Sequence, residues 1–274
     1  SSFAKFLVTG QGAQAGLQWL CANDVGVSPG RVVYTQLLNT RGGIECDLTI
    51  VVLSPERYYI VTGTGFATHD LDYLTRGLRE TADAQISEVT SGYSVLSLFG
   101  PNARALLESL DVQGIGNDTF PFASARDIAL RGTRILALRI SYVGELGWEL
   151  HIPTEFTLSV YDQIIEAGQT FGLRNCGYRA IESLRLEKGY RAWGADITAD
   201  TTPYEAGLGF AVKDHNAIPF VSGAALLRQR ARPLLKRLAG FSITDKDVVL
   251  LGRESILRNE EQAGWLSSGG YGHS

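Results

Sequence analysis

A strand predicted over residues 44–53 carries an aspartate, Asp47, near its centre. Successive side chains of a strand point to opposite faces, so Cys46 and Leu48 belong to an apolar face and Asp47 to the other. Aspartate is depleted in strands because its carboxylate competes with the backbone for hydrogen bonds. A carboxylate held rigidly there could move a proton or stabilise a developing cation. Strand alternation alone is equally compatible with a solvated sheet face, so both interpretations stay open at this point.

A second pair of polar residues, Tyr142 and Glu149, flanks the glycine-rich turn 143–147 of another predicted hairpin. The two strands of a hairpin lie side by side, so we expect these residues to be close in space. Glu149 points opposite to Trp148 and Leu150. A carboxylate can accept two parallel N–H bonds, which suits an arginine or the edge of a pterin ring. The alternative is an outward-facing polar surface without chemistry.

Two further motifs have simpler explanations. The glycine-rich segment 10–16 follows a predicted strand and enters a helix, as in dinucleotide-binding folds. Such a fold continues into a parallel strand, whereas here residues 31–39 and 44–53 form a predicted hairpin, so we expect a plain strand-to-helix turn. NAD(P) binding there remains an alternative. The charged segment 182–188 has the i, i+3 and i+4 spacing of an exposed, salt-bridged helix face.

The cysteines and histidines give no support to a metal site. Cys21, Cys46 and Cys176 are far apart and odd in number, and neither they nor the four histidines show the spacing of zinc ligands. We therefore expect buried free thiols, a reducing compartment and no bound metal.

Composition limits the classes of partner. The chain has 274 residues, of which 45% are hydrophobic and 20% charged, so it can bury a substantial core. A formal net charge of -4 gives no basic surface for nucleic acid or an anionic membrane. Its apolar runs are much shorter than a membrane-spanning helix, and its first residues lack the pattern of a secretory signal. We expect no nucleic-acid or membrane partner, and a cytoplasmic location, or the mitochondrial matrix in a eukaryote.

The elements that must position these residues follow no regular βαβ order. Strands are predicted at 5–9, 31–39, 44–53, 58–62, 94–99, 133–142 and 148–152, and helices at 13–22, from Thr68 onward, and at 103–110, 155–167, 179–188 and 223–230. This order predicts an α+β fold with antiparallel sheets. The tail adds predicted strands at 237–243 and 254–265 before a serine- and glycine-rich stretch, which we interpret as an incomplete small β subdomain.

Seven segments, in order along almost the whole chain, resemble the glycine-cleavage T-protein (aminomethyltransferase) family. They are LCANDV (20–25), GRVVYTQLLNTRGGIECDLTIVVL (30–53), RYYIVTGTGFATHDLDYL (57–74), SLFGPNARALL (97–107), RISYVGELGWELHIP (139–153), GYRAIESLRLEKGYRAWGADIT (177–198) and TPYEAGLGFAVK (202–213). The resemblance is most specific to the folate-binding half of dimethylglycine and sarcosine dehydrogenases.

The resemblance implies antiparallel sheets with flanking helices, arranged as a clover-leaf of subdomains around a folate channel. The corresponding divisions are residues 1–118, an α+β subdomain; 119–216, a ferredoxin-like subdomain; and 217–274, a β-barrel-like subdomain that is incomplete. These boundaries are expectations from the family's organisation.

The resemblance also implies roles for site residues. The family's carboxylate in the hairpin strand matches Asp47, which would be catalytic. Its folate contacts match Leu48 and Thr49 through the backbone, together with Tyr142, Glu149, Leu150 and Phe210. One position departs from the T-protein pattern: the arginine of its ARDSLRLE-like helix aligns with Ile181, which argues against an aminomethyl-lipoyl protein arm as the donor.

The implied activity is transfer of a one-carbon unit from an N-methyl amine-derived imine to tetrahydrofolate, forming 5,10-methylenetetrahydrofolate. Tetrahydrofolate is the expected cofactor, and FAD is expected only where a separate amine-oxidising domain or subunit is present. The expected partners are the folate, an amine-derived one-carbon donor and, optionally, that flavin dehydrogenase domain or subunit. The alternatives are a folate-dependent demethylase that forms 5-methyltetrahydrofolate and a non-catalytic folate-binding regulatory module.

Overall fold

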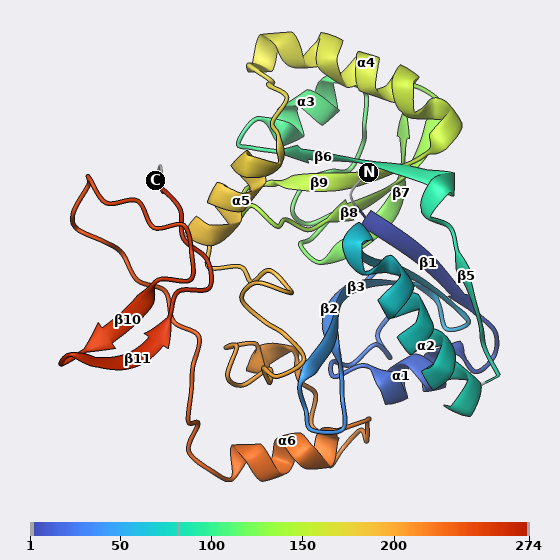
Figure 1. Cartoon of the computed structure of the whole chain (residues 1–274). Coiled ribbons are helices and arrows are strands. Elements are labelled where there is room, and N and C mark those ends of the chain that lie inside the picture. Colours follow the sequence, from blue (N-terminus) through green and yellow to red (C-terminus); the bar gives the residue numbers. More distant parts are fainter. Residues whose placement is uncertain (1–2, 82, 273–274) are drawn as a thin grey trace.

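The computed structural model describes residues 3–81 and 83–272. Two antiparallel sheets form its centre, and helices cover the outer face of each (Figure 1). The predicted α+β class with antiparallel sheets and flanking helices is confirmed. Among the described helices, none combines the length and hydropathy needed to cross a bilayer.

The first sheet has five strands in the order β2-β3-β4-β1-β5. These are β1 (Phe3–Thr9), β2 (Val32–Leu38), β3 (Ile44–Ser54), β4 (Arg57–Gly63) and β5 (Gln85–Glu88). The predicted hairpin of β2 and β3 is confirmed. β1 is antiparallel to both of its neighbours, β4 and β5. The glycine-rich segment 10–16 therefore lies outside any parallel βαβ unit, and the dinucleotide-binding alternative loses its structural basis.

Two helices cover one face of this sheet, α1 (Ala13–Leu20) and α2 (Ala67–Thr81). In α1 the buried residues recur at helical spacing, which turns one apolar stripe toward the strands. Leu74 and Leu78 of α2 enter the same core. The predicted start of α2 at Thr68 was late by one residue, because a 3-10 turn at Thr64–Phe66 leads directly into the helix.

The second sheet has four strands in the order β6-β9-β8-β7. They are β6 (Tyr93–Phe99), β7 (Ser124–Leu130), β8 (Thr133–Arg139) and β9 (Gly147–Pro153). The helices α3 (Ala103–Ser109) and α4 (Thr157–Gly168) pack on its outer face. β8 ends at Arg139, three residues before the predicted end of that strand. β7 was not predicted as a strand.

The predicted division after residue 118 does not coincide with the sheets. β6 and α3 precede that position, yet β6 pairs along its whole length with β9. The order of elements is β6-α3-β7-β8-β9-α4, whereas a ferredoxin-like subdomain has the order β-α-β-β-α-β. The observed order differs from the ferredoxin-like order because β9 follows β8 directly, and β6 joins this sheet from the other side of the predicted boundary.

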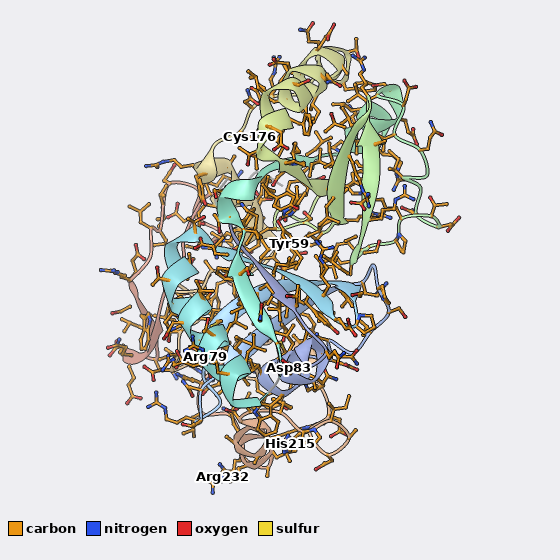
Figure 2. The ribbon with its side chains drawn as sticks, turned by 90° about the vertical axis from the view of Figure 1, so that its right-hand side faces the viewer. Tyr59, Arg79, Asp83, Cys176, His215 and Arg232 are labelled. Carbon is orange, nitrogen blue, oxygen red and sulfur yellow. The ribbon has the colours of Figure 1, made fainter. Side chains whose placement is uncertain are left out.

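The inner faces of the two sheets pack against each other. Their shared core contains residues of both, namely Val32, Val51, Tyr59, Val61, Ala125 and Leu138. In Figure 2 Tyr59 lies between the two sheets. The molecule is thus layered as helices, sheet, sheet and helices. Each sheet buries both faces, so polar residues on the inner faces are not solvated by default.

The chain after α4 packs against the end of the first sheet and then extends away from it. Helix α5 (Tyr178–Glu187) is followed by a segment whose residues Ile197, Ala206 and Leu208 share a third core with the ends of β2 and β3. Helix α6 (Gly223–Arg230) adds Leu226 to that core. The predicted boundary at 216/217 therefore also cuts through packed residues.

The tail contains one hairpin, β10 (Ser255–Arg258) and β11 (Glu261–Trp265), placed apart from both sheets in Figure 1. Residues 237–243, predicted as a strand, have no regular structure, and 254–265 is this hairpin instead of one strand. No closed barrel forms among the described residues. Apolar alternation indicated strands there, but no neighbouring strand pairs with residues 237–243.

Candidate functional site between the two sheets

Asp47 lies in the middle of β3, on the face that turns away from α1 and α2, as strand alternation predicted. Gln36 of β2 is its cross-strand neighbour, and Gln36 Nε2 donates a hydrogen bond to Asp47 Oδ1 over 3.0 Å. The hydroxyl of Tyr34 also favours the charged form of the carboxylate. The solvated-face interpretation of Asp47 is therefore wrong, because the half-buried carboxylate accepts a hydrogen bond from Gln36.

The groups around Asp47 change its pKa in opposite directions. Burial raises the pKa of Asp47 to about 6, and Tyr34 and Gln36 act against that rise. The negative charge of Asp70 raises the pKa further. The carboxylate is thus ionised at neutral pH but close enough to its pKa to exchange a proton, which suits a general base or an electrostatic stabiliser of a cation.

Glu149 lies on β9, opposite Leu138 of the neighbouring strand β8. Its neighbours Trp148 and Leu150 belong to the core under α3 and α4, so the predicted opposite orientation of Glu149 is confirmed. The alternative of an outward-facing polar surface is wrong: Glu149 is only 5% exposed, because its face of the sheet packs toward the first sheet. A buried carboxylate requires partners, since desolvation of an unpaired charge is costly.

His151 is a buried neighbour of Glu149. It is fully buried two residues further along β9, and its Nε2 lies 3.5 Å from Glu149 Oε2. Its Nδ1 lies 2.9 Å from the hydroxyl of Tyr59 on β4. This chain of contacts ties Glu149 of the second sheet to the first sheet. Sequence reasoning missed both His151 and Tyr59, which lie 92 positions apart.

Tyr142 follows β8 and contacts the segment after α5. Its hydroxyl donates a hydrogen bond to the carbonyl of Arg191 over 2.9 Å, and its ring stacks on Tyr190 at a centroid distance of 6.0 Å. Burial raises the pKa of Tyr142 to about 12, with a smaller contribution from the charge of Asp47. Tyr142 is therefore within electrostatic reach of Asp47.

The other predicted contact residues fall into two groups. Phe210 is 74% exposed and stacks on Tyr34 at 6.3 Å, and Thr49 shares the face of Asp47. Leu48 and Leu150 are 1% and 0% exposed and point into the cores under the helices. Only the backbone of these two leucines can therefore contribute to a site between the sheets.

A buried arginine that the sequence did not single out positions the segment behind Tyr142. Arg185 of α5 is 1% exposed and donates hydrogen bonds to the carbonyl of Tyr190 over 3.1 Å and to the carboxylate of Asp196. Glu182 is also its partner and is exposed, so the predicted salt-bridged surface is right for Glu182 and wrong for Arg185. The charge spacing was the available signal, but it did not reveal burial.

The structure brings together Cys46, His69 and Asp70, whose donor atoms lie within 4.8 Å of one another. Asp70 Oδ2 already accepts a hydrogen bond from Thr62 Oγ1, and Asp70 Oδ1 lies 2.9 Å from His69 Nδ1. Burial raises the pKa of the Cys46 thiol and so disfavours the thiolate. These contacts account for the group without an ion. Of the expected buried thiols, Cys21 and Cys46 are buried, but Cys176 is exposed.

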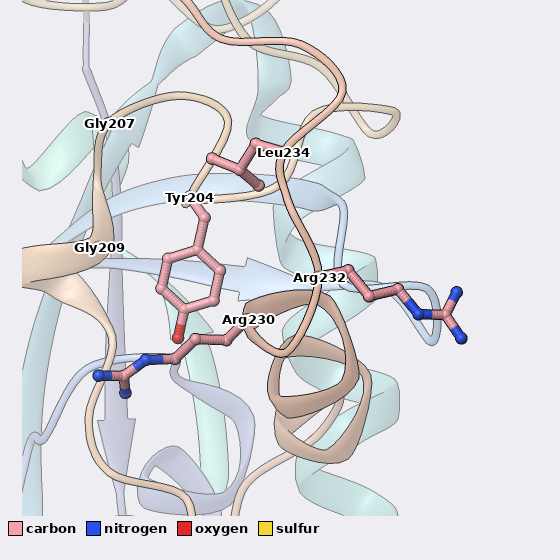
Figure 3. A pocket seen from close by; sticks show the side chains of 6 residues that line it. All are labelled: Tyr204, Gly207, Gly209, Arg230, Arg232 and Leu234. Atoms are coloured by element: carbon pink, nitrogen blue, oxygen red, sulfur yellow. The ribbon is translucent and has the colours of Figure 1, made fainter.

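Two open hollows lie at the surface, and Asp47 lines neither. One, of about 360 Å³, lies between residues 204–209 and the end of α6, and in Figure 3 its Arg230 and Arg232 extend in opposite directions. The other, of about 340 Å³, follows the turn between β8 and β9 and includes Lys188 and Tyr190. Because Tyr190 stacks on Tyr142, the second hollow adjoins the candidate site.

The family described as the GCVT N-terminal domain matches residues 1–216. The chain belongs to this family. The glycine-cleavage T-protein family resemblance of the sequence is thereby confirmed. A solved relative of the GCVT family, the glycine cleavage system aminomethyltransferase T from Bartonella henselae, superimposes with a TM-score of 0.88 at 26% identity, covering 99% of this chain and 73% of that one.

Curated GCVT relatives include human mitochondrial sarcosine dehydrogenase, 38% identical over 286 residues, which cover 99% of this chain and 31% of the relative. The mouse mitochondrial pyruvate dehydrogenase phosphatase regulatory subunit is 35% identical over 283 residues, covering 100% of this chain and 32% of the relative. The chain thus spans about a third of the length of these relatives. The family is aminomethyltransferase-like. The names of the relatives described above nevertheless refer to different activities of the whole proteins.

Proposed function

We propose that this chain binds tetrahydrofolate and catalyses one-carbon transfer from an N-methyl amine-derived imine, with 5,10-methylenetetrahydrofolate as the product. The observation that carries the proposal is Asp47. Its half-buried carboxylate has a pKa of about 6, a hydrogen bond from Gln36 and a position facing the second sheet. A poised carboxylate at that place suits transfer of a proton next to a developing cation.

The residues around Asp47 suit a flat heterocycle that carries N–H donors. Tyr34 and Phe210 offer one stacked pair of rings, and Tyr142 and Tyr190 offer another. Glu149 offers a buried acceptor with His151 beside it. When bound, tetrahydrofolate supplies two amine nitrogens, N5 and N10, that accept the one-carbon unit.

Each proposed residue has a separate role. Asp47 holds or takes up the proton that the amine nitrogen releases, and its negative charge stabilises a cationic donor. Glu149 fixes the orientation of the pterin by accepting its N–H groups. Tyr142 and Phe210 contact the faces of the bound ring. Thr49 and the backbone of Leu48 line the site on β3, and the backbone of Leu150 lines it on β9.

The donor and the partners extend the same proposal. The relative named sarcosine dehydrogenase supports an amine-derived donor, delivered by a flavin dehydrogenase domain or subunit, and FAD would belong to that partner. The chain itself then acts after the oxidation, on the imine. A location in the cytoplasm, or in the mitochondrial matrix of a eukaryote, is part of the proposal; two relatives are named as mitochondrial.

A non-catalytic folate-binding module is the second candidate, and a relative named as a phosphatase regulatory subunit favours it. The two functions differ in what Asp47 does, because a module that only binds folate needs no carboxylate poised near pH 6. A folate-dependent demethylase differs in its product, 5-methyltetrahydrofolate.

Tetrahydrofolate titration followed by product analysis tests these functions together. Candidate donors are the imines derived from dimethylglycine and sarcosine, with aminomethyl-lipoate as a comparison. The proposal expects saturable folate binding and 5,10-methylenetetrahydrofolate from an amine-derived imine. Binding without turnover of any donor would favour the regulatory module, 5-methyltetrahydrofolate would favour the demethylase, and absence of binding would reject all three.

A further inference from the structure

Gln36 is a fully buried polar residue whose side chain contacts the candidate site. It is 0% exposed on β2, directly opposite Asp47 of β3. Its Nε2 donates to Asp47 Oδ1 over 3.0 Å. The NH₂ group of Gln36 thus lies against the carboxylate.

The other end of the same amide has no partner. Gln36 Oε1 is buried and makes no hydrogen bond. An unpaired buried oxygen costs stability, so an apolar side chain of the same length would suit folding better at this position. Gln36 therefore lowers the stability of the fold through its oxygen while its nitrogen binds the Asp47 carboxylate. A residue that reduces stability in this way is typical of a functional site.

We propose that Gln36 is a positioning residue for Asp47, which fixes the orientation of its carboxylate and keeps it ionised through the Nε2 hydrogen bond. This inference rests on the proposed function for its effect on turnover. Its effect on the Asp47 carboxylate is independent of folate. The side chains of Gln36 and Asp47 thus form one hydrogen-bonded pair across β2 and β3.

Other charged and titratable groups also act on Asp47, and they stay in place when Gln36 is replaced. Tyr34 acts on it from β2, Tyr142 from the turn after β8, and the charge of Asp70 from α2 on the other face of the sheet. Tyr34 lowers the pKa of Asp47 and Asp70 raises it. Replacement of Gln36 by an apolar residue removes one hydrogen bond to the charged form, so the pKa of Asp47 should rise.

The decisive variant is Gln36→Met, which keeps the side-chain length and removes the donor. We expect an Asp47 pKa higher by about one unit in a carbon-13 NMR titration without folate. We expect little change in the thermal midpoint, because removal of the unpaired oxygen offsets loss of the hydrogen bond to Asp47. With folate and donor, kcat should fall about tenfold while KM for tetrahydrofolate changes less than about twofold.

A matched control is Gln163→Met on α4. Gln163 also has a buried, unpartnered Oε1, and its Nε2 donates to Ser159 Oγ over 3.0 Å, away from the site. This variant should leave the Asp47 pKa and kcat unchanged. Gln36→Glu is a second test if Gln36→Met does not fold, because it keeps the shape but replaces the donor by a carboxylate, and it should raise the Asp47 pKa more strongly.

An unchanged Asp47 pKa in the folded variants would overturn the proposal. A lower thermal midpoint with unchanged kcat would do the same, since it would make Gln36 a structural residue only. If the wild-type chain shows no turnover with any donor, the proposed function fails, while the folate-free titration still decides whether Gln36 positions Asp47.

Discussion

The chemistry of Asp47 depends on how a sheet residue is kept half-buried and ionised. Tyr34 and Gln36 favour its charged form, and burial and Asp70 disfavour it. Asp47→Asn keeps the shape and removes the charge. We expect kcat to fall by about 10² to 10⁴, the usual contribution of acid–base catalysis, with folate affinity maintained. Steady-state kinetics and calorimetric titration test this; equal loss of affinity and turnover, or loss of neither, would reject the catalytic role.

The pH dependence of activity should report the same group. With a pKa of about 6, Asp47 becomes protonated as the pH falls through that value. We therefore expect kcat/KM to decrease below about pH 6 in the wild-type chain and to lose this acid limb in Asp47→Asn. An acid limb that persists in the variant would assign it to another residue.

The contribution of Asp47 to the stability of the fold should decrease as the pH rises, whereas its contribution to activity should increase. The pKa of Asp47 rises on folding from its ordinary 3.8 to about 6, so the folded chain binds this proton more readily between those values. Its contribution to stability is therefore lost as the pH rises through the window. At pH 7 we expect Asp47→Asn to increase the free energy of unfolding by about 1 to 3 kcal/mol, and near pH 3 to change it little. Urea unfolding at both pH values measures the difference.

Glu149 should act on affinity instead of turnover. Glu149→Ala removes a buried acceptor, and the donors of the bound ring would lose their partner. We expect folate affinity to fall by about 1 to 3 kcal/mol, or roughly 5- to 150-fold. The exposed residue Glu155 provides a control, since Glu155→Ala should leave binding unchanged. Unchanged affinity in Glu149→Ala would remove this residue from the site.

At the level of elements, the β2–β3 hairpin is fixed where it meets residues 199–201. A Cβ added at Gly43 would lie 1.8 Å from the carbonyl oxygen of Ala199, a distance that requires the backbone to move. The backbone N–H of Ile44 donates to Thr201 at the same place. The glycine therefore permits the close approach that holds the third core against the end of the hairpin.

Gly43→Ala tests this close approach. We expect a loss of about 1 to 3 kcal/mol in the free energy of unfolding and a higher KM for folate, since Asp47 lies four residues along the same strand. Gly92→Ala serves as the control, because a Cβ there would meet nothing within 4 Å. Thermal unfolding and kinetics of both variants suffice; equal stability of the two would show that the hairpin tolerates a shift at Ala199.

At the scale of the whole molecule, the two sheets create the site by facing each other. Leu138 is 0% exposed in the core between them and lies opposite Glu149. Leu107 is equally buried, but in the core under the outer helices. These two leucines therefore separate the effect of lost packing from the effect of altered sheet-to-sheet contact.

We expect Leu138→Ala and Leu107→Ala to lose comparable stability, about 2 to 5 kcal/mol each. Only Leu138→Ala should also weaken folate binding, because the inter-sheet contact beside Glu149 relaxes. Thermal unfolding compared with folate titration measures both effects. If both variants bind folate equally, packing between the sheets does not set the site.

Much of the architecture was predictable because its signals are local. The glycine-containing turns and the two-residue alternation of β3 and β9 fixed which side chains share a face. The same reasoning failed for residues 237–243, where alternation has no partner strand, and for the boundary at 118, because β6 before it pairs with β9 after it. Alternation within a segment does not show whether that segment pairs with a strand distant in the sequence.

The amino-acid sequence by itself determined the antiparallel α+β class, the hairpin strand of Asp47 and the orientation of Glu149 relative to Trp148 and Leu150. Only the tertiary structure decided that both carboxylates lie on buried inner faces, and that Gln36 and His151 lie beside them. The physical reason is that alternation specifies a face but not what covers it. Burial, and with it the raised pKa of Asp47, arises when faces distant in the sequence pack together.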